Sequence, residues 1–260
     1  MHEPELTAFI SLLSQQGYKD FLIDIGANIG LTSCQNGVQF DEVHMFEPNP
    51  LCCHILEVNA KIALTSKKYF INNFGLGNEN KTTVLTVPKH NWGGAFIKDK
   101  SNSYDDSVLA QKDGFELLDQ RNYFDIEIVI KNTTDELRRL FLTLSKKNLY
   151  NGVIKIDVEG YEPIVLKGIA ESLPEDMNAY IVFESWDSNF DINEIIDAFK
   201  GRAEVAKLDR YVLKRKGLIG LIDLLYMVLR SDFSTKLKKI DPIQNNCIGD
   251  IVIKVNQLAV

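Results

Sequence analysis

Short apolar runs alternate with longer helical segments along this chain, and this alternation constrains the fold more than any other feature. The run at residues 21–25 precedes a helical stretch from about Ile29, and the run at 42–46 precedes a helix that begins at Pro50. Apolar runs of this length are typical of buried strands. Their alternation with helices predicts a mostly parallel sheet covered on both faces. We therefore expect an α/β fold with a doubly wound sheet and right-handed crossovers.

Further segments continue the pattern. Strands are expected at 69–72, 126–130, 153–157 and 179–184, with two late extended segments at about 203–213 and 248–255. Helices are expected from a cap at Thr133 or Thr134 through Leu144, at 161–172 and at 193–200. After the third strand, Gly75 and Gly77 followed by an extended stretch at 82–87 predict a hairpin.

One domain spanning residues 1–260 accounts for this order of segments. Within it, residues 88–125 are polar and irregular and form a hairpin or loop insertion, and residues 201–260 form a divergent C-terminal part. Ligands of such sheets bind outside the carboxyl ends of the strands. The informative residues are therefore those that directly follow each strand.

The composition of the 260 residues excludes several classes of protein. Hydrophobic residues make up 45% and charged residues 25%, which excludes disorder and collagen-like repeats. A net charge of −7 argues against nucleic acid as a partner, because non-specific binding of nucleic acid needs a positive surface. The four cysteines lack Cys-x-x-Cys spacing and the N-terminus lacks a basic signal-peptide region, so we expect free thiols in a cytoplasmic protein.

The longest apolar stretch, residues 217–229, has two interpretations. It includes Asp223 and is too short to cross a bilayer, and basic residues flank it on both sides. A core or lid helix is the simpler interpretation. A helix lying on an anionic membrane surface is the alternative.

A glycine-rich turn, Asp-Ile-Gly-Ala-Asn-Ile-Gly at residues 24–30, follows the first strand. Glycines allow a sharp turn and the close approach of a ligand, and the helix that follows presents its positive N-terminus. A dinucleotide fingerprint requires glycine where Asn28 stands, and a P-loop requires a lysine where Leu31 follows Gly30. The turn therefore favours a ligand without a pyrophosphate, although a purely structural tight turn is the alternative.

The second strand ends at Glu47, which is 17 residues after Gly30. A carboxylate in this place can accept hydrogen bonds from both hydroxyls of a ribose. A solvated acid is the alternative for Glu47 alone. Together, the glycine-rich turn and the acid at the second strand predict a nucleoside-binding site.

Several motifs of this chain resemble those of a known family. The turn at 24–30 and Phe-Glu-Pro-Asn-Pro at 46–50 look like the first two motifs of class I, Rossmann-like, S-adenosylmethionine-dependent methyltransferases. The runs Lys-Ile-Asp-Val-Glu-Gly-Tyr-Glu at 155–162 and Val-Leu-Lys-Gly at 165–168 are similar to the FkbM type. Segments 73–78, 82–88 and 133–137 resemble the same family, although Thr134 stands where the family often has leucine. The resemblance covers about residues 21–184.

The resemblance implies methyl transfer from S-adenosylmethionine to a hydroxyl oxygen of a sugar, polyketide or similar metabolite or glycan, leaving S-adenosylhomocysteine. Because the donor is already activated, the protein mainly aligns acceptor and methyl. The family's pattern gives candidate donor-binding residues along the strand ends. We expect Gly26, Asn28 and Gly30 to line the methionine and ribose, and Glu47, with Pro48 and Asn49, to hold the ribose. Asp24 orients the turn or the donor's ammonium, and Asn73 and Phe74 flank the adenine. Asp157 lies near the methyl group or, alternatively, is a structural carboxylate that caps the helix beginning near Tyr161.

A hydroxyl acceptor also benefits from a general base. The candidates are Asp157, Glu159, Glu184 and His90, the last because an unperturbed histidine titrates near pH ~6.5. The three carboxylates could instead hold a divalent metal through oxygen ligands, which is the less favoured interpretation.

Two other functions compete with catalysis of methyl transfer. One is a non-catalytic module that binds S-adenosylmethionine or a partner, and the other is a nicotinamide-dependent oxidoreductase, which Asn28 disfavours. A homodimer is compatible with either interpretation.

Overall fold

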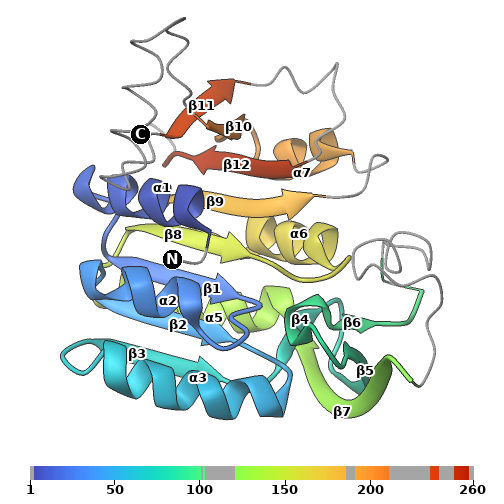
Figure 1. The fold of residues 1–260 in the computed structure, drawn as a ribbon. Helices are drawn as coiled ribbons and strands as arrows, with labels where there is room; N and C mark the ends of the chain where they lie inside the picture. The colour runs from blue at the N-terminus through green and yellow to red at the C-terminus, as the bar shows by residue number, and fades with distance from the viewer. Residues whose placement is uncertain are drawn as a thin grey trace, which may run out of the picture.

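The computed structural model describes residues 3–100, 102, 121–185, 191–210, 235–239 and 249–257. An eight-stranded sheet in the order β11-β10-β12-β9-β8-β1-β2-β3 forms its centre (Figure 1). The strands are β1 (Phe21–Ile25), β2 (Glu42–Phe46), β3 (Lys68–Asn72), β8 (Asn151–Ile156), β9 (Asn178–Ser185), β10 (Ala203–Arg210), β11 (Thr235–Lys239) and β12 (Gly249–Val255). Strands β3, β2, β1, β8 and β9 pair in parallel, whereas β12 pairs antiparallel to β9 and β10. The expected mostly parallel α/β sheet is confirmed.

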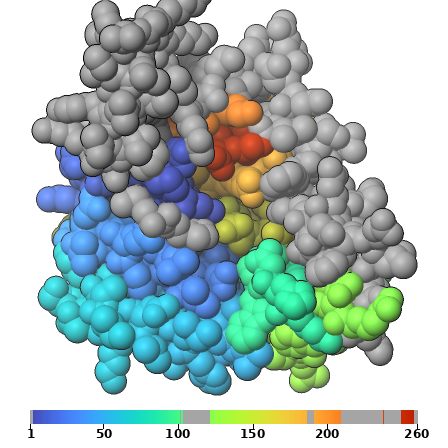
Figure 2. Space-filling model, viewed as in Figure 1, coloured from blue at the N-terminus to red at the C-terminus, as the bar shows by residue number. Residues whose placement is uncertain are grey.

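Helices cover both faces of this sheet (Figure 1). The helices are α1 (Pro4–Gln15), α2 (Leu31–Asn36) and α3 (Pro50–Ala63) on one face, and α5 (Thr133–Ser145), α6 (Glu162–Ser172) and α7 (Ile192–Ala198) on the other. Phe9 and Leu13 of α1 pack with Leu56 of α3 in one core, while Phe141 of α5 and Val165 of α6 belong to the other. Figure 2 shows the surface of the first face, where α1 to α3 run from blue to cyan. Our sequence interpretation assigned no element to the stretch that forms α1.

A second, four-stranded sheet lies beside the carboxyl ends of β1 and β2 (Figure 1). Its strands, in the order β4-β7-β5-β6, are β4 (Gly75–Gly77), β5 (Lys81–Pro88), β6 (Phe96–Ile97) and β7 (Tyr123–Asn132). The short 3-10 helices η1 (Gly37–Gln39) and η2 (Trp92–Gly94) complete the described elements.

The expected hairpin between 73–80 and 82–87 is wrong in its pairing. Strand β4 pairs in parallel with β7, and β7 lies between β4 and β5. A Cβ atom at Gly75 or Gly77 would collide with the side chain of Ile130 on β7. The two glycines therefore allow a distant strand to approach closely instead of marking a local turn.

The N-cap of helix α5 lies one residue before Thr133 and two before Thr134, the two expected caps. Asn132 is the N-cap, and its side chain accepts a hydrogen bond from the backbone N–H of Asp135. The hydroxyl of Thr133 donates to the carbonyl of Gly77, and that of Thr134 donates to Glu171. Both threonines thus join α5 to its neighbours instead of capping it.

The C-terminal part contributes three strands, β10, β11 and β12, to the main sheet. Within the described residues, none of the helices has the length and apolar character needed to cross a membrane. The apolar stretch 217–229, most of the insertion (101 and 103–120) and Cys247 lie outside the described residues. Cys34, Cys52 and Cys53 are free thiols.

The buried guanidinium of Arg202 holds this C-terminal part to the rest of the sheet. It donates to the carbonyl oxygens of Asn256 (2.8 Å), Pro174 (2.9 Å), Met177 (2.8 Å) and Leu173 (3.4 Å). One side chain therefore connects the start of β10, the end of β12 and the loop that precedes β9.

We predict that Arg202→Met lowers the free energy of unfolding by roughly 3 kcal/mol, because several buried carbonyl oxygens lose their donor. Urea denaturation of the purified variant measures this loss. Lys167→Met, which removes a positive charge from an exposed position on α6, serves as control and should leave the free energy of unfolding nearly unchanged. Equal stabilities of the two variants would contradict the prediction.

Candidate functional site

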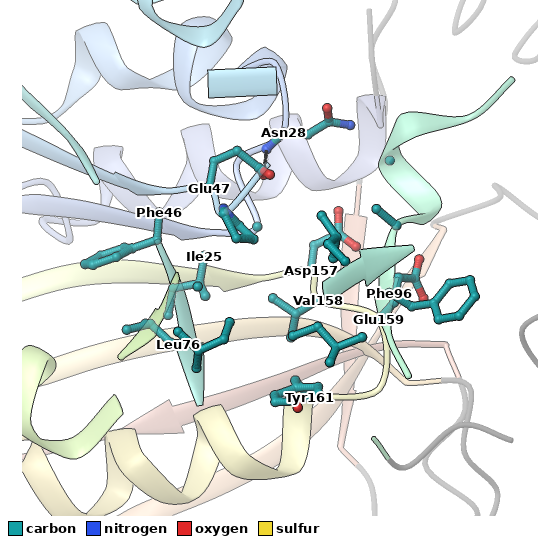
Figure 3. A pocket seen from close by; sticks show the side chains of 18 of the residues that line it. Ile25, Asn28, Phe46, Glu47, Leu76, Phe96, Asp157, Val158, Glu159 and Tyr161 are labelled. Carbon is teal, nitrogen blue, oxygen red and sulfur yellow. Dashed lines mark hydrogen bonds between the residues drawn. The ribbon is translucent and has the colours of Figure 1, made fainter. Parts of the chain in front are cut away.

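A cavity of about 720 Å³, its open mouth included, lies at the carboxyl ends of β1, β2 and β8. Its lining combines polar residues from the loops after these strands with apolar residues from the second sheet. Figure 3 shows Asn28 and Glu47 on one side of the cavity, Asp157 and Glu159 on the other, and Leu76 and Tyr161 on a third. The structure thus brings together loops that are far apart in the sequence.

The glycines of the turn after β1 have different roles. Gly26 lines the cavity and has a φ of +77°, and a Cβ atom there would collide with the backbone carbonyl of Asp157. Gly30 has a φ of +84° at the start of α2, where a Cβ atom would collide with the Leu56 side chain. Gly26 therefore lets the loops after β1 and β8 touch, whereas Gly30 is buried outside the cavity lining and lets α2 pack on α3.

Glu47 is buried at the end of β2, and its carboxylate joins two loops. Oε2 accepts from the backbone N–H of Asn28 (2.7 Å), and Oε1 accepts from that of Asn49 (2.8 Å). Burial raises the pKa of Glu47 to about 7, and the two backbone hydrogen bonds oppose this rise. Each oxygen retains a lone pair that a ligand hydroxyl can use.

Asn28 presents an unsatisfied polar atom at the cavity. Its backbone adopts a φ of 50°, which is uncommon outside glycine, and its side chain lines the cavity. The buried Oδ1 of Asn28 has no hydrogen-bond partner within the described residues. A buried acceptor of this kind is stabilised when a ligand donates to it.

Asp24 is fully buried beneath the turn and does not reach the cavity lining. The hydroxyl of Ser33 donates to its Oδ2 (2.7 Å), and Lys155 Nζ lies 3.3 Å from its Oδ1. Of the two roles expected for Asp24, orientation of the turn is the one that this geometry provides.

Three other residues that we expected to contact the donor instead contact the loop after β2 or its neighbours, outside the cavity. Asn49 caps α3 by accepting from the backbone N–H of Leu51 (3.0 Å). Asn73 Nδ2 donates to the carbonyl of Glu47 (2.9 Å), and Phe74 packs edge-on against Phe46 with ring centroids 5.6 Å apart. None of the three lines the cavity, whereas Pro48 does.

The loop after β8 forms the opposite wall. The backbone N–H of Asp157 donates to the carbonyl of Ile25 (2.9 Å), and its side chain is 41% exposed at the cavity. Glu159 lines the cavity and forms a backbone bridge with Phe96. Asn102 Nδ2 donates to the carbonyl of Glu159 (3.0 Å), and Tyr161 donates to Asp99 (2.7 Å), so the segment after β6 is fixed to this wall.

His90 and Glu184 lie away from these residues. His90 is exposed in the turn after β5, and Glu184 is half-buried near the end of β9, opposite Asp250 in the register with β12. Neither lines the cavity. Across the described part of the chain, no three His, Cys, Asp or Glu side chains come together as a set that could hold a metal ion.

Our sequence interpretation gave no role to Lys155 or to the apolar wall of the cavity, which Leu85, Trp92 and Phe96 help to form. A lysine between isoleucines in a strand expected to be buried is a signal for an internal ion pair, because lone buried charges are costly. Trp92, Phe96 and Leu85 of the wall come from the insertion and the strand before it. Their approach to the cavity depends on the pairing of β7 with β5, which no local motif indicates.

The fold and the site define an α/β protein with a cavity at the carboxyl ends of parallel strands, which is where ligands of such sheets bind. Residues 24–210 match the family model described as the methyltransferase FkbM domain. The chain therefore belongs to the FkbM methyltransferase family.

Individual proteins are also similar to this chain. The methyltransferase sdnD of Sordaria araneosa is 29% identical over an alignment of 177 residues, which covers 64% of this chain and 66% of the relative's own length. Among solved structures, a precorrin-6y C5,15-methyltransferase from Geobacter metallireducens is 10% identical, with a TM-score of 0.44 over 99% of this chain and 90% of that one. A precorrin 8w decarboxylase from Methanobacterium thermoautotrophicum has the same identity and TM-score over 97% and 89% of the two chains.

The raised pKa of Glu47 predicts a pH-dependent affinity for S-adenosylhomocysteine. We expect the ribose hydroxyls to donate to the ionised carboxylate, so below pH about 7 binding should release a proton and the affinity should fall by up to about tenfold per pH unit. Calorimetric titrations between pH 6 and 8 measure this trend. Glu47→Gln should bind more weakly at pH 8 and show no such trend; the same trend in the variant would refute the assignment.

Linkage also gives the sign of the effect of Glu47 on folding. Its pKa is raised from 4.5 to about 7, so the proton is held more tightly in the folded protein than in the unfolded chain. The contribution of Glu47 to stability is therefore fully present below pH 4.5 and is lost as the pH rises through about 7. Glu47→Gln should flatten this part of the profile of unfolding free energy against pH.

We predict that Gly26→Ala abolishes measurable binding of S-adenosylhomocysteine, because the added Cβ displaces the carbonyl of Asp157 at the cavity. Gly201→Ala is a matched control, since Gly201 also has a positive φ (+79°) but nothing lies within 4 Å of its added Cβ. The control should lose about 1 kcal/mol of stability through backbone strain and keep its affinity. Calorimetry would contradict the prediction if the two variants bound equally well.

Proposed function

We propose that this chain is an S-adenosylmethionine-dependent O-methyltransferase that acts on a hydroxyl of a sugar or other small, uncharged metabolite. One observation carries the proposal: the nucleoside-type wall of Asn28 and Glu47 faces the carboxylates of Asp157 and Glu159 across a single cavity. A methyl donor on the first wall and a hydroxyl beside the second would be within one enclosed space.

The donor side of the cavity offers groups that suit S-adenosylmethionine. Glu47 is placed to accept the ribose hydroxyls, and the unsatisfied Oδ1 of Asn28 can accept from the donor's ammonium or a hydroxyl. When bound, the donor supplies an activated methyl group on a positively charged sulfur. The protein's own task is then to hold acceptor and donor in line and to exclude water.

The acceptor side favours an uncharged hydroxyl compound. The residues that line the described cavity include Glu47, Asp157 and Glu159 but neither lysine nor arginine, which disfavours phosphorylated or nucleic-acid acceptors. Trp92, which is half-buried at the cavity, supplies an apolar surface against which a carbon skeleton can pack.

A base for the acceptor proton comes from the same wall. Asp157 and Glu159 both line the cavity, whereas His90 and Glu184 do not. Of the four candidates, these two carboxylates are therefore favoured, with Asp157 the more exposed to the cavity. Removal of the hydroxyl proton as the oxygen–methyl bond forms is the step that such a base accelerates.

We expect micromolar binding of S-adenosylhomocysteine by calorimetry and transfer of tritium from methyl-labelled S-adenosylmethionine to one fraction of the metabolites of the source cell. Asp157→Asn should reduce the transfer rate about 100-fold, the usual range for loss of a general base, and affect donor affinity far less. Asp41→Asn, the same substitution at an exposed residue directly before β2 and away from the cavity, is the control.

The outcomes separate the competing functions. Binding without labelling of any fraction would favour the non-catalytic module, and binding of a nicotinamide dinucleotide in place of S-adenosylhomocysteine would favour the oxidoreductase. Unchanged turnover in Asp157→Asn would remove Asp157 from the mechanism. Loss of turnover with EDTA would restore the metal-dependent interpretation.

A further inference from the structure

Lys155 is a buried lysine on a central strand of the main sheet. It lies on β8 between two isoleucines, is 5% exposed, and is paired in the register of β1 and β8 with Asp24. Burial of a lone ammonium is costly, so a lysine in this place must be compensated by close acceptors.

Three acceptors surround the ammonium, and they come from strand β1 and from the loops that follow β1 and β8. Lys155 Nζ lies 3.3 Å from Asp24 Oδ1, 3.2 Å from the carbonyl oxygen of Gly26 and 3.1 Å from Asp157 Oδ2. Two of these contacts, to Gly26 and to Asp157, are hydrogen bonds, and the contact with Asp24 is an ion pair. Burial by itself lowers the pKa of Lys155, but Asp157 and Asp24 outweigh it and hold the pKa above its ordinary value, which keeps the group charged.

The two carboxylates at this ammonium differ in their surroundings. Asp24 is fully buried and held from its other side by Ser33, so it cannot move. Oδ1 of Asp24 has no hydrogen bond within the described residues, which leaves Lys155 as the cation that compensates it. Asp157, by contrast, is 41% exposed and faces the cavity. The ammonium therefore has a fixed anchor on one side and a group of the site on the other.

From this geometry we infer that Lys155 is a positioning residue for methyl transfer: anchored by Asp24, it fixes the direction of the Asp157 carboxylate and the carbonyl of Gly26. With Oδ2 of Asp157 held by Lys155, the other oxygen is directed to the acceptor. Lys155 itself does not line the cavity, so it acts through Asp157. The inference rests on the proposed function, because it assigns a residue to that reaction.

A double-mutant cycle of Lys155→Met and Asp157→Asn tests this role. The assay measures the maximal rate and the donor KM for tritium transfer to the metabolite fraction that the wild-type protein labels. Lys155→Met should lower the maximal rate roughly tenfold to hundredfold, as expected for a misplaced catalytic group, and change the donor KM much less. In the Asp157→Asn background, Lys155→Met should lower the rate no further.

Two further variants separate positioning from folding. Lys155→Met combined with Asp24→Asn removes both buried charges together; it should restore the stability lost in Lys155→Met alone and leave the rate low. Lys147→Met is the matched control, because Lys147 pairs with buried Glu42 (2.8 Å) at the opposite end of the sheet. It should lower stability in urea but not the maximal rate.

Three results would overturn the inference. The first is that Lys155→Met and Asp157→Asn lower the rate independently, so that their losses multiply in the double variant. The second is that Lys155→Met combined with Asp24→Asn folds and has the wild-type rate. The third is that Lys147→Met loses as much rate as Lys155→Met. If the wild-type protein labels no fraction, the proposed function fails and the inference fails with it. If the wild-type protein labels a fraction and Lys155→Met labels it equally fast, only the inference fails.

Discussion

Strand β1 pairs along its full length with β2 on one side and β8 on the other, and the geometry of the site depends on this arrangement. Parallel pairing aligns the carboxyl ends of the three strands, so the loops that follow them must meet at one edge. The loops are then locked to one another by contacts of the main chain. Glu47 accepts the N–H of Asn28, and Gly26 packs directly on the carbonyl of Asp157. The order of the strands therefore determines where the cavity lies, and the side chains determine its lining.

Much of this arrangement could be predicted from local signals. The bounds of β2 and α3 follow from an apolar run that ends at Glu47 and from Pro50 in the first helical turn. The pairing of β4 with β7 could not be predicted, since it joins segments about 50 residues apart and depends on how two glycines accommodate Ile130. Helix α1 has a local signal, the helical spacing of its buried residues Phe9, Ile10 and Leu13, which our sequence interpretation did not use.

The candidate site shows the same division between local and distant information. Position after a strand correctly indicated that Asn28, Glu47 and Asp157 meet at one cavity. Position after a strand did not show that Asp157 lines the cavity while Glu184 does not. Both residues lie near the carboxyl end of a strand, but β9, which carries Glu184, is farther from β1 than β8 is. The acidic residues also differ physically. Asp24 is compensated by an ammonium, whereas Glu47 is held by backbone amides. A net charge of −7 does not reveal this difference.

The second sheet has a consequence for how the protein could diversify. Its residues, among them Leu85, Phe96 and Ile130, form one wall of the cavity, while Asn28 and Glu47 come from the main sheet. The two walls are encoded by separate stretches of the chain. Replacement of the segment from β4 to β7 would therefore remodel one half of the chamber while the other half keeps its geometry.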